Sequence, residues 1–266
     1  MKDKEGRNIT YLRISVTDRC NLRCVYCMPS EGIRLVEHSQ ILSFDQIVEF
    51  TKVAVSMGIE KVRITGGEPL VRKGIELLVE KIASIEGVKE LTMTTNGTLL
   101  EIFAHRLKAA GLNRVNISMD TTDPVRYKEI TRGGNISELI KGINAAKEAG
   151  LEPVKLNCVI NSSPQEQDAS GVAEFAKNNN LQVRFIPLMN LCRGEFGQVI
   201  GGDGGNCARC NRLRLTATGL LKPCLFSDVA FNIKELGAVK AIEAALKHKP
   251  PRGGCNSTGA FYNIGG

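Results

Sequence analysis

Short runs of hydrophobic residues alternate with longer amphipathic runs from about residue 10 to residue 190. The hydrophobic runs are rich in Val, Ile, Leu and Thr, as the buried strands of parallel sheets are. Strands that alternate with helices in this way are typical of a parallel sheet. The predicted strands are Thr10–Val16, Lys61–Thr65, Leu91–Thr95, Arg114–Met119, Val154–Ile160 and Val183–Leu188.

The amphipathic runs place hydrophobic residues at helical spacing. In Phe44–Met57, Ser43 is suited to cap the N-terminus and Gly58 to end the helix. Gly111 and Gly150 mark the ends of two other helices. The remaining predicted helices are Ile75–Ile85, Leu99–Ala110, Ser137–Ala149 and Val172–Asn178.

The pattern changes after about residue 190. Glycines crowd the segment Gly194–Gly205. Two short runs, Leu213–Thr216 and Leu220–Pro223, then flank a turn and predict a β-hairpin. A helical run, Lys234–Lys247, follows, and the Gly-rich tail from Gly253 to Gly266 is expected to be extended.

Six strand–helix units predict an α/β fold, a partial (β/α)6 TIM-like barrel with a small C-terminal hairpin and helix extension. Periodicity alone leaves a doubly wound sheet open as the alternative. We expect residues 1–190 to form the barrel and residues 191–266 a second domain with a Gly-rich tail. In either fold, the chemistry is expected at the C-terminal ends of the strands.

The composition is that of an ordinary globular protein, with 24% charged and 42% hydrophobic residues among 266. The net charge of +7 favours an anionic partner, whereas 5% aromatic residues and no Trp argue against a nucleic-acid stacking platform. We therefore expect an anionic metabolite and no nucleic acid. The polar N-terminus and the absence of a long apolar run predict a cytoplasmic location without a membrane partner.

Six of the nine cysteines form two close groups, which favours metal binding over disulfides in a cytosolic chain. Cys20, Cys24 and Cys27 follow the first strand with C-x3-C-x2-C spacing. Three thiolates leave one iron of a cubane cluster open, and an open iron can bind a small molecule through nitrogen and oxygen. A zinc site, or thiols that are merely buried, are the alternatives.

The second group has C-x2-C-x13-C spacing and consists of Cys207, Cys210 and Cys224. It again offers three thiolates. A zinc ribbon is a stronger alternative here, because a C-x2-C pair on a hairpin is common in zinc sites. Cys192 or Cys255 would then supply a fourth ligand.

The loop from Asp18 to Pro29 resembles the signature loop of the radical S-adenosylmethionine (SAM) superfamily, with Tyr26 just before the third cysteine. The segment Thr65–Pro69 resembles the GGE motif of that superfamily. Four segments taken together resemble the molybdenum-cofactor GTP 3′,8-cyclase family. They are Thr94–Thr98, Asn116–Asp120, Arg184–Met189 and Asn206–Phe226.

The resemblance implies a radical SAM lyase with SAM and two [4Fe-4S] clusters as cofactors. Such an enzyme cleaves SAM, takes hydrogen from C3′ of the GTP ribose and joins C3′ to C8 of guanine, which gives a precursor of molybdenum cofactor. The second domain becomes an auxiliary-cluster domain whose open iron binds guanine. The resemblance also implies an electron donor such as flavodoxin or ferredoxin, and it allows a homodimer.

The resemblance also assigns residues. The cluster ligands are Cys20, Cys24, Cys27, Cys207, Cys210 and Cys224. The SAM contacts are Tyr26, Gly66, Gly67, Glu68, Ser118 and Met189. The GTP contacts are Arg13, Arg63, Thr94, Lys155, Arg212, Leu213 and Arg214, with Lys61 and Arg184 as weaker matches. The resemblance also implies that two tail residues, Gly265 and Gly266, reach into the active site.

The chain departs from the family between Met189 and Cys207, where only the residues from Asn190 to Asn206 stand in place of several dozen. Pro187 also replaces a residue that is often Glu in the family. Two alternatives follow. One is a radical SAM enzyme with another substrate, such as a peptide. The other is a zinc-binding module without catalysis.

Overall fold

The computed structural model describes residues 1–257 and 261–264. One nine-stranded sheet runs through it in the order β6-β5-β4-β3-β2-β1-β7-β8-β9. The strands from β6 to β7 in this order are parallel to their neighbours, and β8 and β9 are antiparallel. The bounds are β1 Tyr11–Ser15, β2 Lys61–Thr65, β3 Glu90–Thr95, β4 Arg114–Ser118, β5 Lys155–Ile160, β6 Gln182–Pro187, β7 Arg212–Leu215, β8 Leu220–Lys222 and β9 Phe231–Asn232.

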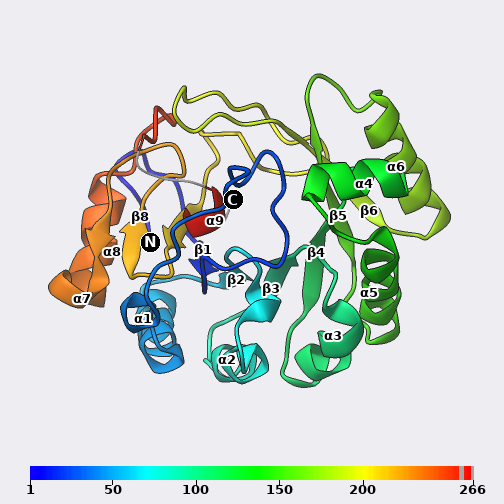
Figure 1. Cartoon of the computed structure of the whole chain (residues 1–266). Helices are drawn as coiled ribbons and strands as arrows, with labels where there is room; N and C mark the ends of the chain where they lie inside the picture. The colour runs from blue at the N-terminus through cyan, green and yellow to red at the C-terminus, as the bar shows by residue number, and fades with distance from the viewer. Residues whose placement is uncertain (258–260, 265–266) are drawn as a thin grey trace.

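Of the nine α-helices in the described residues, α1, α2, α3 and α5 follow one another along the outer side of the curved sheet, as Figure 1 shows. Their bounds are α1 Phe44–Ser56, α2 Ile75–Ala83, α3 Leu100–Ala109, α4 Pro124–Thr131, α5 Ile136–Glu148, α6 Gln167–Asn178, α7 Ile233–Leu236, α8 Ala238–Lys247 and α9 Phe261–Ile264. Two short 3₁₀ helices are His38–Gln40 and Pro69–Val71. The large hydrophobic core fills the space between the sheet and the outer helices.

The architecture confirms the predicted α/β fold, a partial barrel of six parallel strands with a hairpin extension. Helices follow the first five of these strands, whereas β6 leads to β7 without a helix in the described residues. The first strand of the hairpin, β7, pairs in parallel with β1 and so continues the barrel sheet. A second, small hydrophobic cluster in the C-terminal part is formed by Leu191, Leu225, Phe226 and Ile264. The division of the chain at residue 190 stays a prediction.

Helix α1 begins as its sequence predicts. The Ser43 hydroxyl accepts a hydrogen bond from the backbone N–H of Gln46, and the Gln46 side chain accepts one from the backbone N–H of Ser43. This capping box satisfies two N–H groups that the first helical turn leaves without partners. Gly58 follows the helix with a φ of +112°, a conformation that favours glycine.

Helices α4, α6, α7, α8 and α9 differ from the prediction. Helix α6 begins at Gln167, five residues before its predicted start. Helix α4 was not predicted, because only Tyr127 and Thr131 of its residues are buried and no hydrophobic period is visible. The segment Lys234–Lys247 is two helices, since Gly237 adopts a φ of +76° between them. The tail predicted to be extended contains the short helix α9.

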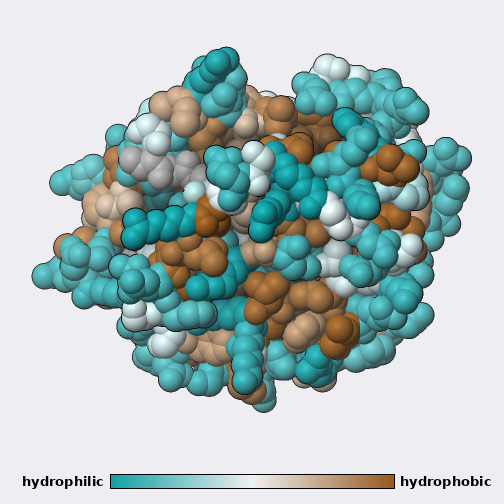
Figure 2. Space-filling model, viewed as in Figure 1, coloured by the Kyte–Doolittle hydropathy of each residue, from teal (hydrophilic) through white to brown (hydrophobic). Residues whose placement is uncertain are grey.

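Hydrophilic side chains cover most of the face shown in Figure 2, and hydrophobic ones form separate patches. In the part of the chain that the structure describes, no helix is both long and apolar enough to cross a membrane.

Candidate active site

The two cysteine groups lie at opposite ends of the barrel. Cys20 follows the C-terminal end of β1, whereas Cys210 precedes the N-terminal end of β7. Because β1 and β7 are parallel neighbours, these positions are at opposite ends of the strands. Each group lines its own cavity, of about 180 Å³ for the first group and about 250 Å³ for the second.

The two cavities adjoin. Asn157, Ile186 and Met189 line both of them. Asn157 and Ile186 lie on the inner side of β5 and β6, and Met189 follows β6. A molecule in the smaller cavity and a molecule in the larger cavity would therefore meet at this shared wall.

Helix α4 holds the first cysteine loop from outside. The backbone N–H groups of Arg23 and Val25 donate to the carbonyls of Thr131 and Ile130, with N···O distances of 3.1 and 2.9 Å. The guanidinium of Arg132, just after the helix, donates to the Met28 carbonyl at 2.7 Å. Helix α4, which was not predicted from the sequence, thus supports the loop that carries the three cysteines.

Tyr26 ties the same loop to the carboxyl end of β4. Its hydroxyl donates to the Asp120 carboxylate, with an O···O distance of 2.6 Å. The other carboxylate oxygen of Asp120 accepts from the backbone N–H of Val159 at 2.8 Å. The cysteine loop, β4 and β5 are therefore joined by a single carboxylate.

Gly66 and Gly67 allow the end of β2 to pack directly on the cysteine loop. A Cβ atom on Gly67 would lie 2.3 Å from the Arg19 carbonyl oxygen, and one on Gly66 would lie 2.7 Å from that of Thr17. Two hydrogen bonds run along this contact, from the N–H of Gly67 to Thr17 and from the N–H of Glu68 to Arg19. Main-chain packing is thus one reason for glycine here.

The smaller cavity brings together most of the residues predicted to bind SAM. Tyr26, Gly66, Gly67, Ser118 and Met189 line it together with the three cysteines. The side chain of Glu68 is wholly buried beside the cavity. Its carboxylate accepts from the N–H groups of Leu70 and Asn96 and from the Thr95 hydroxyl, at 3.0, 2.7 and 2.7 Å.

The donor set in the smaller cavity fits an iron–sulfur cluster. Burial raises the pKa of Cys24 to about 12, with Asp120 adding to the effect, and burial also raises the pKa of Cys27 to about 12. Such thiols keep their protons until a metal displaces them. Each thiolate of a cluster binds a different iron. Among the described residues, no group of three or more His, Cys, Asp and Glu could hold a single metal ion. The fit to a cluster therefore rests on the three cysteines that line the same cavity.

The larger cavity is cationic. Arg13 on β1 is the register partner of both Arg63 on β2 and Arg214 on β7, and all three line the cavity. Asp203 is the one carboxylate in the lining that the structure describes. The complete set of lining cations is Arg13, Lys61, Arg63, Arg114, Arg184, Arg212 and Arg214.

A carboxylate at the edge of this cavity offsets part of the positive charge. Glu90 forms ion pairs with Lys61 and Arg114, the latter with an N···O distance of 2.6 Å. Burial lowers the pKa of Arg63, and Arg114 and Arg184 lower it further. A cavity with this surplus of positive charge is suited to a polyanion such as a triphosphate.

Tyr11 lies among these cations and was not predicted to contribute. Its ring centroid is 5.4 Å from Lys61 Nζ, 5.6 Å from the Arg63 guanidinium carbon and 5.7 Å from that of Arg212. Its hydroxyl is buried without a hydrogen-bond partner. Such an orphaned group at a cavity wall is suited to contact a ligand.

All three cysteines of the second group line the larger cavity. Burial raises the pKa of Cys210, but Lys249 and the backbone N–H of Arg212 more than offset this, so the pKa lies below its ordinary value. Burial raises the pKa of Cys224. This donor set also fits a cluster with three thiolate ligands.

The structure does not place every predicted GTP contact in the larger cavity. Thr94 lines the smaller cavity and accepts a hydrogen bond from Arg63 at 3.4 Å. Lys155 lines neither cavity, and the Leu213 side chain points into the hydrophobic core, which leaves only its main chain for a contact. Gly265 and Gly266 lie outside the described residues.

Sequence reasoning missed Arg114 and Asn157, which line the larger cavity. The available signal was their position. Arg114 begins β4, next to Thr92 in the register, and Asn157 lies in β5 next to Ser118. Both therefore lie on strands already predicted to line the barrel.

A family model described as the radical SAM superfamily matches residues 14–176. A protein named GTP 3′,8-cyclase from Thermodesulfovibrio yellowstonii is 42% identical over 89% of this chain and 88% of its own length. One of the same name from Petrotoga mobilis is 41% identical over 94% of each chain. That alignment has 302 positions, more than the 266 residues here, so this chain lacks residues that the relative has.

Solved structures share the fold. Methylornithine synthase superimposes with a TM-score of 0.57 at 17% identity, covering 69% of this chain and 54% of that chain. Streptococcus suis SuiB bound to S-adenosylmethionine gives 0.54 at 19% identity, covering 69% of this chain and 41% of that chain. The chain thus spans about half the length of these two proteins or less.

Proposed function

The chain belongs to the GTP 3′,8-cyclase family of the radical SAM superfamily, and on that premise we propose that it converts GTP to a 3′,8-cyclised precursor of molybdenum cofactor. The observation that carries the proposal is the shared wall of Asn157, Ile186 and Met189 between a three-thiol cavity and a cationic cavity. Because the cavities share this wall, the radical source and the triphosphate would occupy adjoining sites.

The enzyme uses SAM and two [4Fe-4S] clusters. The first cluster, when bound, supplies the electron that cleaves SAM reductively, which is chemistry that the cofactors bring and the protein directs. Cys20, Cys24 and Cys27 are assigned as its ligands. When bound, this cluster would also bind the amino and carboxylate groups of SAM.

The residues around the first site hold and orient SAM. The main chain at Gly66 and Gly67 is assigned to its amino group and the Ser118 hydroxyl to its carboxylate. Tyr26 and Met189 complete the lining. Glu68 supports this set indirectly, since it fixes Thr95 and the backbone of Asn96 at the adjacent strand end.

The larger cavity is assigned to GTP. Arg13, Arg63, Arg212 and Arg214 neutralise the triphosphate, because their planar guanidinium groups bind phosphate oxygens through paired hydrogen bonds. Lys155, Thr94 and the main chain of Leu213 are assigned to the nucleotide at its periphery. The tail residues Gly265 and Gly266 keep their predicted role at the active site.

The second cysteine group orients the base. Cys207, Cys210 and Cys224 are assigned as the ligands of the second cluster, which would bind guanine and so orient C8 relative to the ribose. Residues 1–190 are the radical SAM barrel in this proposal, and residues 191–266 are the auxiliary-cluster domain. An electron donor such as flavodoxin or ferredoxin would reduce the first cluster. A second copy of the chain is the other proposed partner, in a homodimer.

Family membership favours GTP over a peptide and catalysis over a zinc-binding module. The shortened segment before Cys207 is the feature that the test must address. We would incubate the reconstituted enzyme anaerobically with SAM, reductant and GTP, and measure 5′-deoxyadenosine and cyclised GTP separately. Both products are expected. A protein that holds zinc and no iron, or one that turns over a peptide and not GTP, would overturn the proposal.

A further inference from the structure

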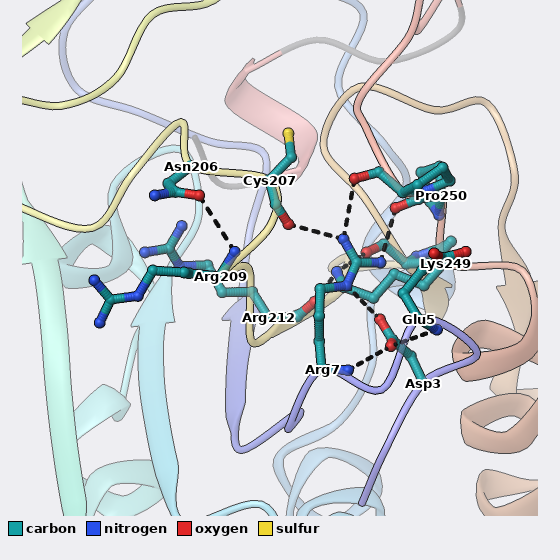
Figure 3. A network of polar contacts seen from close by, with 11 residues as sticks. Asp3, Glu5, Arg7, Asn206, Cys207, Arg209, Arg212, Lys249 and Pro250 are labelled. Atoms are coloured by element: carbon teal, nitrogen blue, oxygen red, sulfur yellow. Dashed lines mark hydrogen bonds and ion pairs between the residues drawn. The ribbon is translucent and has the colours of Figure 1, made fainter.

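Two buried cations, Arg7 and Lys249, lie near the second cysteine group, and Figure 3 shows them with Cys207 of that group. Neither lines the larger cavity. Lys249 is 1% exposed, and the Arg7 side chain is 8% exposed. A charged side chain is rarely buried to this degree unless its donors are used.

Arg7 connects the N-terminal segment to the first cysteine of the group. One terminal nitrogen of its guanidinium donates to the Cys207 carbonyl, with an N···O distance of 2.9 Å. The other donates to the Pro250 carbonyl at 2.8 Å. The backbone of Cys207 is thus held to the segment that carries Lys249.

Lys249 connects the two other cysteines. Its ammonium group donates to the carbonyls of Arg212 and Pro223, with N···O distances of 2.7 Å in both cases. Arg212 is two residues after Cys210, and Pro223 immediately precedes Cys224. The ammonium group also interacts with the thiol of Cys210.

Asp3 fixes the orientation of Arg7. Its carboxylate accepts from Arg7 Nε at 2.6 Å, from the Arg7 backbone N–H at 2.9 Å and from the Glu5 N–H at 3.0 Å. The Asp3 side chain is fully buried. A buried ion pair with this many hydrogen bonds specifies one geometry.

We propose that Arg7 and Lys249, oriented by Asp3, form a brace that sets the spacing of the three cysteines of the second group and places positive charge beside the cluster they bind. Each cysteine has a braced carbonyl at its own position or within two residues. The brace makes Arg7 and Lys249 positioning residues. The inference rests on the proposed function, which assigns an iron–sulfur cluster to this group.

The positive charge of Arg7 and Lys249 would stabilise the bound cluster. Three thiolates give a bound cluster negative charge in a partly buried place, and nearby cations and hydrogen bonds stabilise such a cluster and tune its potential. Because Lys249 donates to backbone carbonyls on both β7 and the end of β8, it also keeps the two arms of the hairpin at a fixed separation.

The test compares Arg7→Met and Lys249→Met with a control, Arg209→Met. Arg209 is a cation between Cys207 and Cys210 with an exposed side chain. After reconstitution of the full chain, iron and sulfide should fall by up to about half in the two brace variants, because one of two clusters is lost. The electron paramagnetic resonance signal of the SAM-binding cluster should remain, and the control should resemble the wild type.

A second measurement uses the metal-free full chain, so that it does not depend on which metal is bound. The alkylation rates of individual cysteines are read by mass spectrometry. In the brace variants, Cys207, Cys210 and Cys224 should react about tenfold faster, whereas Cys20, Cys24 and Cys27 keep their rates. Unchanged rates and full iron content in both variants would overturn the brace.

The two failures are distinguishable. A wild-type chain without iron at the second group contradicts the proposed function, and the alkylation rates still decide whether the brace exists. If a methionine variant exposes all six thiols, it has lost its fold, and Asp3→Asn then decides, because it removes the charge that orients Arg7 and leaves both cations in place. Asp3→Asn with wild-type thiol reactivity and iron content would contradict the brace.

Discussion

Arg13 on β1 and Arg214 on β7 are partners in the parallel register, so two guanidinium groups from neighbouring strands enter the same cavity. Burial holds the pKa of Arg13 well below its ordinary value, and Arg214 lowers it further. Like charges on neighbouring strands repel each other, and both attract an anion. The arrangement therefore favours a bound polyphosphate.

Loss of either hairpin arginine should weaken the binding of GTP. For Arg212→Ala and Arg214→Ala we expect GTP dissociation constants about ten- to a hundredfold higher, because each removes charge-assisted hydrogen bonds to phosphate. Cleavage of SAM should persist. Isothermal titration with GTP checks the first point and the 5′-deoxyadenosine yield the second. Arg126→Ala, at an exposed arginine, is the control. Unchanged GTP affinity in both Arg212→Ala and Arg214→Ala would refute the phosphate assignment.

Removal of the Tyr11 hydroxyl should have opposite effects on the free protein and on binding. This hydroxyl is buried without a partner, so Tyr11→Phe should leave the nucleotide-free chain as stable as the wild type or up to about 1 kcal/mol more stable. The affinity for GTP should fall up to about tenfold, since a contact to the nucleotide is lost. Chemical denaturation and titration measure the two quantities.

Tyr127→Phe is the matched control for Tyr11, because Tyr127 is also buried but lines neither cavity. Its affinity for GTP should equal that of the wild type. A Tyr11→Phe variant that binds GTP normally but unfolds more easily would assign Tyr11 to structure alone.

Glu68 should make stability depend on pH. Burial raises its pKa from 4.5 to about 7 in the folded chain, although three donors oppose this. The unfolded chain therefore releases the proton first as the pH rises, and the free energy of unfolding should decrease between about pH 4.5 and pH 7. This group accounts for a decrease of about 3 kcal/mol.

Denaturation curves for the wild type and Glu68→Gln at several pH values test this point. The difference in unfolding free energy between the two should change across that range and level off above it. Glu86→Gln, which alters an exposed carboxylate, should run parallel to the wild type. Parallel curves for Glu68→Gln as well would show that Glu68 does not titrate there.

A methyl group on Gly67 should displace the first cysteine loop. The added Cβ would lie 2.3 Å from the Arg19 carbonyl, which is backbone and cannot move aside alone. Gly67→Ala should therefore lower stability by about 1–3 kcal/mol and reduce occupancy of the first cluster. Gly254→Ala, where the added atom meets nothing within 4 Å, is the control. Normal iron content and SAM binding in Gly67→Ala would contradict the packing argument.

The strands could be predicted because buried parallel strands carry continuous hydrophobic runs. Lys61–Thr65 is β2 to the residue, and the other five barrel strands differ by one residue at one or both ends. Helix α4 could not be predicted, since it is short and mostly exposed and begins at Asp123 and Pro124 with no periodic run behind them.

Residues of the candidate site could be predicted where they belong to a sequence motif. They could not be predicted where only their burial in the fold marks them. The cysteine spacings identified the six residues of the two groups, and all six line one of the two cavities. Lys249 follows a helix in the polar string His248-Lys249-Pro250, and its sequence neighbours give no sign that it is fully buried. Burial of a charged side chain depends on segments that are distant in the sequence, here β7 and the end of β8.

In the proposed reaction, a radical made in the smaller cavity reacts with GTP in the larger one, in spite of the short segment before Cys207. The most direct measurement uses GTP that carries deuterium at C3′, incubated anaerobically with the reconstituted enzyme, SAM and reductant. The proposed reaction should yield 5′-deoxyadenosine that carries deuterium, together with cyclised GTP. Unlabelled 5′-deoxyadenosine without a cyclised product would contradict it.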